Sequence, residues 1–404
     1  MKTFFKRHTD LSKDENVVFL AAISVFLPYY LSIAIIAVLS FYIMFKTNFK
    51  KTVFNHLGSF LIPVFTVYTA VVSIVYKNVL GFFCSIFFFV LLVLGYYLRS
   101  IMTSELFENA LDLICVTSIF SSCIVILEKI IFFNIDWHRC FGDFFNNIYF
   151  SFYFHPNYLG TIMAAVVLIC AYKVVLRGTD KKYYYAIAIL AAVAMFLTES
   201  MFAWIEVLVG LSILLLIARR HQLLSIMFIF VAFAAALLYT SPEIFENFFP
   251  RIMHADGTFD NRVLIWDLTI ESIKQTPWFG RGFFAYYKIS LGNPAAYQTT
   301  HAHNLFLESL LSFGIIGSVI LLVMIFIIFY RVVLCKNLLR KSSITVLIFS
   351  ITAAILIHSI VDMTMLWVQT GLLYCIIMGG IGADERKIKK IFGNRFRKNK
   401  TNLH

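Results

Sequence analysis

Two histidines open the stretch HAHNLFLESLLSFGIIG at residues 301–317, where a polar segment becomes almost wholly apolar. His303 and Asn304 stand at the junction between a predicted loop and a predicted helix. A histidine at such a junction is partly removed from water, and its pKa then lies near neutrality, which suits a general base. The alternative is an interfacial histidine that only caps the helix. Residue chemistry alone leaves both interpretations open.

Arginines lie upstream of this junction. The stretch DNRVLIWDLTIESIKQTPWFG, residues 260–280, predicts a short amphipathic helix that Asp260 or Asn261 caps and that Pro277 ends. Arg262 falls in its first turn, beside free backbone N–H groups and the positive end of the helix dipole, which is a natural anion site. An ordinary surface arginine on an interfacial helix is equally compatible with this position.

A second arginine follows in the stretch WFGRGFFAYY. Gly280 and Gly282 flank Arg281, as in a turn that cradles a phosphate. Two glycines at this spacing are weak support for a phosphate site, and the pattern alone favours a simple turn.

Composition identifies the setting of these residues. Of 404 residues, 60% are hydrophobic and 14% are charged, whereas soluble domains average about 45–50% and about 25%. The chain is therefore predicted to be an integral membrane protein. The N-terminus lacks the features of a signal peptide. The seven cysteines are scattered without a CxxC pair, which argues against a disulfide framework or a zinc site.

Apolar runs long enough to cross a bilayer recur along the chain. The predicted spans are 17–28, 29–45, 57–76, 79–98, 109–130, 158–176, 183–198, 201–218, 223–240, 304–330, 343–361 and 365–381. The first two form either one long helix or two short ones hinged near Pro28. Two spans there place both termini in the cytoplasm and 26 of the 34 Lys and Arg residues on the inner side, as the positive-inside rule requires.

The predicted fold class is thus an all-α polytopic membrane protein with about 12 transmembrane helices and a large external loop between spans 9 and 10. We expect four regions: an N-terminal membrane bundle (1–240), an external catalytic loop (241–302), C-terminal spans (303–381) and a basic cytoplasmic tail (382–404). The tail is expected to lie on the anionic inner leaflet, and nucleic-acid binding is the weaker reading of its charge. The loop is too long to be a mere connector, and long loops are usually functional.

The order of these motifs resembles a known family. One pattern resembles the H-N-x9-G-x-x-G signature of the O-antigen ligase and polymerase superfamily of envelope glycosyltransferases. It consists of His303-Asn304, nine further residues and then Gly314-Ile315-Ile316-Gly317. Two further stretches are also similar to that family: NRVLIW followed by PWFGRGFFAY, and HPNYLGTI at residues 155–162. One departure is clear, because Met201 stands where the family often has an arginine.

The resemblance implies a GT-C-like fold and a reaction on the outer face of the cytoplasmic membrane. A glycan moves there from an undecaprenyl-diphosphate carrier to an acceptor sugar hydroxyl. His303 is then the expected base, and Arg262 and Arg281 bind the diphosphate, because arginine forks suit such oxygens. Residues expected to bind substrate are Arg251, Asn304, His301, Asn157 and Trp266. Membrane lipids are the other expected partners.

No metal site and no cofactor are predicted, because the external carboxylates show no paired arrangement. Three intramembrane groups stay unassigned: Glu308, and His358 with Asp362, which lie four residues apart and so share a helical face. A structural His–Asp hydrogen bond and a functional role are both compatible with that spacing.

Three functions remain open at this point. A lipid-linked-glycan flippase would predict internal repeats and broken helices at the midplane, and no repeat is visible. A ligase for lipid A core would need positive charge beyond that required by the donor. Only eight basic residues are predicted outside, and the segment 134–157 is rich in aromatic and amide side chains that suit neutral sugars. The sequence therefore favours a capsular or exopolysaccharide polymerase.

Overall fold

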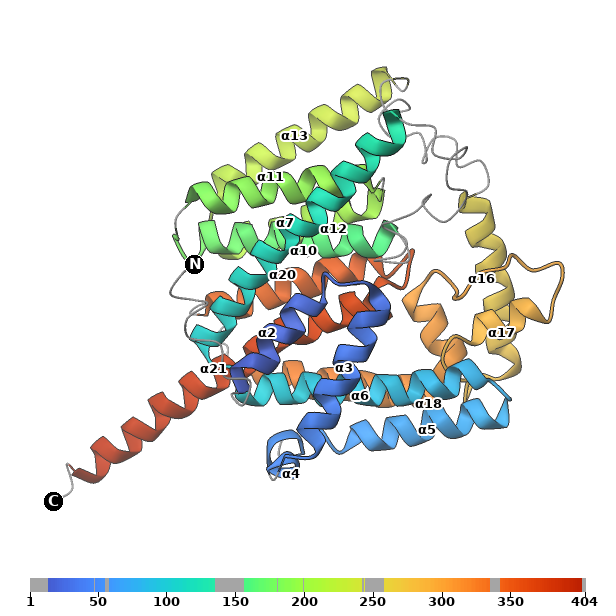
Figure 1. Cartoon of the computed structure of the whole chain (residues 1–404), viewed down its shortest axis with the longest axis horizontal. Helices are drawn as coiled ribbons and strands as arrows, with labels where there is room; N and C mark the ends of the chain where they lie inside the picture. Colours follow the sequence, from blue (N-terminus) through green and yellow to red (C-terminus); the bar gives the residue numbers. More distant parts are fainter. Residues whose placement is uncertain are drawn as a thin grey trace.

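The computed structural model describes residues 14–46, 48–54, 58–134, 156–179, 181–198, 200–241, 243, 258–334 and 342–401, and the regular elements in these ranges are all helical (Figure 1). The helices are α2 (Asp14–Ser24), α3 (Tyr29–Met44), α4 (Phe49–Val53), α5 (Leu61–Val75), α6 (Val79–Ile101), α7 (Ser104–Asn134), α10 (Pro156–Val175), α11 (Lys181–Leu197), α12 (Met201–Ile217), α13 (His221–Thr240), α16 (Thr258–Gln275), α17 (Ala285–Leu291), α18 (Leu305–Leu334), α20 (Ser343–His358), the 3-10 turn η2 (Thr364–Leu366) and α21 (Val368–Thr401).

Helix length tests the predicted spans. Within the described ranges, five helices are long and apolar enough to cross a membrane: Val79–Ile101, Ser104–Leu127, Pro156–Val175, His221–Thr240 and Leu305–Tyr330. A further five apolar helices are shorter, with 10–17 residues. The all-helical membrane architecture is thus supported, but the count of twelve spans is not confirmed. The 11 residues of α2, at about 1.5 Å each, fall short of a hydrocarbon core of about 30 Å.

The predicted hinge near Pro28 is confirmed. Helix α2 ends at Ser24, and Pro28 occupies the N-cap position of α3 with φ −50°. Proline has no N–H to donate and clashes with a preceding helical turn, so the two helices separate there.

Helix α10 forms the centre of the bundle, and α13 lies at its edge (Figure 1). Most α10 residues are buried, including Tyr172 and Leu168, whereas no residue of α13 is buried. An apolar helix with no buried face fits a lipid environment, because lipid tails are as apolar as its side chains.

The helix ends gather polar groups at two separate places. At what we call the site end, the start of α10, the start of α18 and the segment after α20 meet through His301, Asn157 and Asp362. At the opposite end, Asp384 accepts hydrogen bonds from Ser342 and Thr345. The described part of the predicted external loop, residues 258–302, includes His301 and so reaches the site end.

A kink in α18 joins the predicted external loop to the bundle. Gly314 interrupts the helix with φ 62° and ψ −172°, which frees backbone groups on either side. The Ile315 and Ile316 amides donate to the carbonyls of Pro277 and Trp278, at 2.8 and 3.1 Å. In return, the amides of residues 281 and 282 donate to the carbonyls of residues 311 and 312, at 2.9 and 2.8 Å. These four bonds pair backbone groups on both sides of the kink with the loop.

The G-x-x-G pattern permits this close crossing. A Cβ added at Gly314 would lie 2.4 Å from the Trp278 carbonyl oxygen, and one at Gly317 would lie 2.5 Å from the Tyr68 ring. The Tyr68 hydroxyl donates to the carbonyls of Phe279 and Phe313, at 2.9 and 2.7 Å. Only glycine leaves room for the loop and the tyrosine at these two points.

The loop also has a small apolar core of its own. Ile265 of α16 and Tyr286 of α17 pack with Ala302 and with Leu311 of α18. Figure 1 shows α16, α17 and the start of α18 together at one side of the molecule. Ile265 is the buried apolar residue of α16 in this core, whereas its neighbour Leu264 faces outward and is 61% exposed.

Candidate active site

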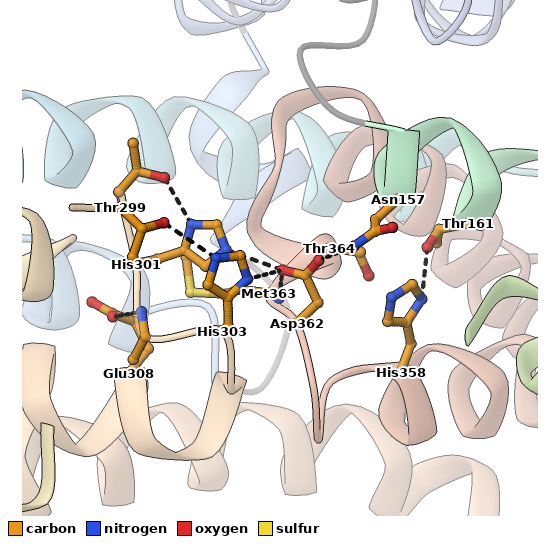
Figure 2. A network of polar contacts seen from close by, with 12 residues as sticks. Asn157, Thr161, Thr299, His301, His303, Glu308, His358, Asp362, Met363 and Thr364 are labelled. Atoms are coloured by element: carbon orange, nitrogen blue, oxygen red, sulfur yellow. Dashed lines mark hydrogen bonds and ion pairs between the residues drawn. The ribbon is translucent and has the colours of Figure 1, made fainter. Parts of the chain in front are cut away.

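Asp362 lies at the centre of a buried polar network at the site end (Figure 2). Its Oδ1 atom is 3.0 Å from His301 Nε2 and 3.3 Å from His303 Nδ1, and it accepts the Met363 amide at 2.7 Å. Its Oδ2 atom accepts a hydrogen bond from Asn157 Nδ2 at 2.5 Å. One carboxylate therefore connects both histidines of the HAHN stretch to the first turn of α10.

The two histidines differ in their exposure. The His301 side chain is 6% exposed, with Nδ1 2.8 Å from the Thr300 hydroxyl, whereas the His303 side chain is 18% exposed. The His303 Nε2 atom lies 3.2 Å from the Thr299 hydroxyl. His303 is thus the more exposed of the two imidazoles. A proton on Nδ1, on the side of Asp362, leaves Nε2 as the basic atom.

The backbone at His303 is also unusual. Its φ is 46°, in the left-handed region that non-glycine residues seldom occupy. Such strain persists only where the surroundings hold it, and it is concentrated at functional sites. Here Asp362, Thr299 and the first turn of α18 hold the residue in place.

The environment lowers the pKa of His303 below its ordinary value. Burial is the main cause, because it disfavours the charged imidazolium. The Asp362 carboxylate opposes this effect, while the neighbouring His301 and Arg262 add to it. His303 is therefore neutral at neutral pH and ready to accept a proton.

The pKa of Asp362 shifts in the opposite sense to that expected from burial. Burial alone would raise it, but the two adjacent imidazoles hold it well below its usual range. The carboxylate is therefore ionised and is the fixed negative charge of the network.

Helix α16 brings Arg262 to this network. The Trp266 indole donates a hydrogen bond to the Ala302 carbonyl at 3.1 Å, directly before His303. Arg262 lies one turn earlier on the same face of α16. The positive charge of Arg262 contributes to the lowered pKa of His303.

Arg281 is not brought to His303. Its guanidinium donates to Gln275 Oε1 at 2.7 Å, to Thr276 Oγ1 at 3.1 Å and to the Ser272 carbonyl at 3.4 Å. These groups belong to the last turn of α16 and to the residue that follows it, about 15 to 20 Å along the helix axis from Arg262, since each residue adds about 1.5 Å. The Arg281 guanidinium is thus bound at the C-terminal end of α16, whereas Arg262 lies near the N-terminal end of this helix.

The glycine turn around Arg281 is a simple turn. The amides of Gly280, Arg281 and Gly282 all donate to carbonyls of the chain. Amides used in this way do not serve as a phosphate cradle. The alternative of a simple turn is the one that the structure supports.

Asn304 and Glu308 hold the histidine segment. The Asn304 Oδ1 atom accepts from the Phe306 and Leu307 amides, both at 2.9 Å, so Asn304 and not His303 is the N-cap of α18. Buried Glu308 accepts the Ala302 amide at 2.9 Å and the Ser312 hydroxyl at 2.6 Å. The predicted substrate contact of Asn304 stays a prediction, since its amide already bonds the backbone.

Arg251, a predicted substrate ligand, lies outside the described residues. Met201, which stands in place of the family arginine, is the first residue of α12 and is 41% exposed.

The sequence did not reveal the role of Asp362. It lies 59 residues after His303, and only its spacing from His358 singled it out. The useful signal was a carboxylate predicted at the outer end of a span, where an unpaired charge is costly and a partner is expected.

The network also has the donor set of a metal site. His301, His303 and Asp362 each offer one ligand atom, and these atoms lie within 4.8 Å of one another. Two histidines and a carboxylate suit several divalent metals. The predicted independence from metals therefore stays a prediction that needs a direct test.

Comparison with known families gives one match, in the central part of the chain. Residues 186–322, from α11 to the middle of α18, match the O-antigen ligase family. This stretch contains Arg262, His303 and the G-x-x-G kink, whereas Asp362 lies beyond it. No curated protein matches the chain. Residues 186–322 are therefore similar to the O-antigen ligase family, whose members are enzymes that transfer glycans in the cell envelope.

Proposed function

We propose that the protein is a capsular or exopolysaccharide polymerase. It would transfer a glycan from an undecaprenyl-diphosphate carrier to a sugar hydroxyl at the non-reducing end of another lipid-linked unit. The observation that carries this proposal is the partly exposed His303, whose Nδ1 lies 3.3 Å from the Asp362 carboxylate and whose pKa Arg262 helps to lower.

In this mechanism His303 Nε2 accepts the proton of the acceptor hydroxyl, in the place that the Thr299 hydroxyl occupies here. The acceptor oxygen forms a bond to the anomeric carbon of the donor sugar. The bond from that carbon to the diphosphate oxygen breaks, and its electron pair leaves with undecaprenyl diphosphate. Asp362 orients the imidazole and stabilises the imidazolium that forms, without taking the proton itself.

Arg262 supplies the charge for the leaving group. Negative charge on the diphosphate oxygen grows as the bond breaks, so a fixed cation near it helps the transition state more than the ground state. The geometry favours Arg262 over Arg281 for this role, because Arg281 already binds the end of α16. Arg281 then acts by holding α16, and with it Arg262, in place.

Purified protein in detergent or vesicles tests the reaction. Given only lipid-linked repeat units, a polymerase builds a ladder of longer glycans. A protein that makes no ladder, yet transfers glycan once to an added lipid A core, is a ligase. The aromatic and amide-rich segment 134–157 and the small number of external basic residues favour the polymerase.

The same proposal places the site on the outer face of a bacterial cytoplasmic membrane, with both termini inside. Labelling with a membrane-impermeant thiol reagent should mark Ala295→Cys in the loop and should not mark Thr179→Cys, both in a background without exposed native thiols. Both positions are exposed, so access from outside alone decides the result. The reverse pattern would overturn the orientation.

A further inference from the structure

A second acid–histidine pair lies inside the helix bundle, beneath the network of Asp362. Glu206 Oε1 of α12 is 2.6 Å from His358 Nδ1 at the end of α20 and accepts the Thr161 hydroxyl of α10 at 2.9 Å. These side chains are at most 1% exposed. Ionisable groups at membrane depth are costly, and they are retained where they serve a function.

The protonation of this pair follows from its surroundings. His358 Nε2 is buried and has no hydrogen-bond partner among the described residues. A doubly protonated ring would bury an unsatisfied charged N–H, whereas a neutral ring leaves only an unused lone pair. His358 therefore donates Nδ1–H to Glu206.

Two helices connect this pair to Asp362. The His358 carbonyl accepts the Val361 and Asp362 amides, at 3.0 and 3.1 Å, so the end of α20 sets the position of Asp362. On α10, Asn157 and Thr161 lie one turn apart on the same face. Figure 2 shows Asn157 reaching Asp362 and Thr161 reaching His358. Helix α10 is thus joined to the C-terminal end of α20 and the segment after it at two points: through Asn157 and Asp362 at the proposed active site, and through Thr161 and His358 inside the bundle.

We propose that Glu206 is a positioning residue for the transfer reaction. It fixes the end of α20 against α10 and α12 through His358 and Thr161, and so sets the place of Asp362 and of the proposed base His303. The inference rests on the proposed function of those two residues. The effect is positional and not a proton relay, because the amide of Asn157 separates the two acid–histidine pairs and does not pass a proton on.

The test is the steady-state kinetics of purified variants. Glu206→Leu keeps a similar volume but removes the acceptor, and we expect kcat to fall about 10–100-fold, as for other residues that orient a reactive histidine. The KM for the lipid-linked donor should stay unchanged. Glu206→Gln keeps an acceptor oxygen for Thr161 and His358 and should recover most of the lost kcat.

A double variant separates positioning from general destabilisation. If Glu206 acts through Asp362, then Glu206→Leu combined with Asp362→Asn should be no slower than Asp362→Asn alone. Additive losses would overturn the inference, as would a full kcat in Glu206→Leu or a Glu206→Gln as slow as the leucine variant. A fully active Asp362→Asn would instead overturn the proposed function itself.

The matched control lies at the other end of the same helix. Asp384 is also a buried carboxylate that holds α20, through Ser342 and Thr345, and Asp384→Leu should keep kcat close to that of the unmodified protein. If Glu206→Leu does not fold, Thr161→Val decides the matter. A lower kcat with unchanged KM supports the inference, and an unchanged kcat overturns it.

Discussion

Helix α20 has a buried carboxylate at each end, and the two differ in their partners. At the opposite end, Asp384 is 4% exposed and accepts hydrogen bonds of 2.6 to 2.7 Å from Ser342 and Thr345. At the site end, Asp362 is 1% exposed and lies against His301 and His303. Hydroxyl groups do not titrate near neutral pH, but imidazoles do. A buried carboxylate that is paired only with hydroxyl groups, such as Asp384, is therefore expected to stabilise the fold. A buried carboxylate that is paired with an imidazole, such as Asp362, can in addition support proton transfer.

Removal of the proposed base at the site end should give the largest difference in transfer rate between changes at the two ends of α20. His303→Ala is expected to lower the rate of glycan transfer about 10²–10⁴-fold, the usual contribution of a general base. Binding of the lipid-linked donor, measured by titration, should persist because Arg262 is unchanged. Asp384→Asn, which alters the opposite end, should keep the transfer rate. Equal rates for His303→Ala and the unmodified protein would contradict the assignment.

The next largest effect is expected on stability, at the kink of α18. Gly314 has a backbone conformation that costs other residues about 1–3 kcal/mol, and a Cβ there would meet the Trp278 carbonyl. Gly314→Ala should therefore lower the melting temperature clearly. Gly178 also has a positive φ, of 63°, but nothing lies within 4 Å of a Cβ there. If Gly178→Ala proved as damaging as Gly314→Ala, close packing at the kink would not be the reason.

A smaller effect is expected in the pH dependence of kcat/KM. Because burial and Arg262 keep the pKa of His303 below 6.5, activity should be full at neutral pH and should fall only at more acidic pH. Arg262→Gln removes a charge that disfavours protonation, so the acidic limb should move to higher pH. Asp362→Asn removes a charge that favours it, so the limb should move to lower pH. Shifts of both variants in the same direction would contradict the proposed electrostatics.

The smallest effect is expected from metal removal. If the His301–His303–Asp362 network transfers protons, treatment with a chelator should leave the transfer rate unchanged. Loss of activity that added Zn²⁺ restores would instead assign these three residues to a metal site.

The sequence was informative where its signals were local. The histidine junction and the G-x-x-G pattern lie within 17 residues, and the hinge at Pro28 follows from proline chemistry. The pairing of Asp362 with the histidines was not visible, because it depends on how α20 ends beside α18. Arg262 and Arg281 were expected together because they share one loop. The loop folds back at 277–282 and bonds to α18, which takes Arg281 to the far end of α16.

The backbone bonds between residues 277–282 and α18 also limit how the site receives its substrate. They involve main-chain groups on both sides, and opening them in an apolar surrounding would leave amides and carbonyls unsatisfied, at a cost of several kcal/mol each. The base of the loop is therefore expected to act as a fixed wall and not as a lid. A lipid-linked donor would then reach His303 by diffusing sideways in the plane of the membrane, and turnover would need no hinged gate at this point.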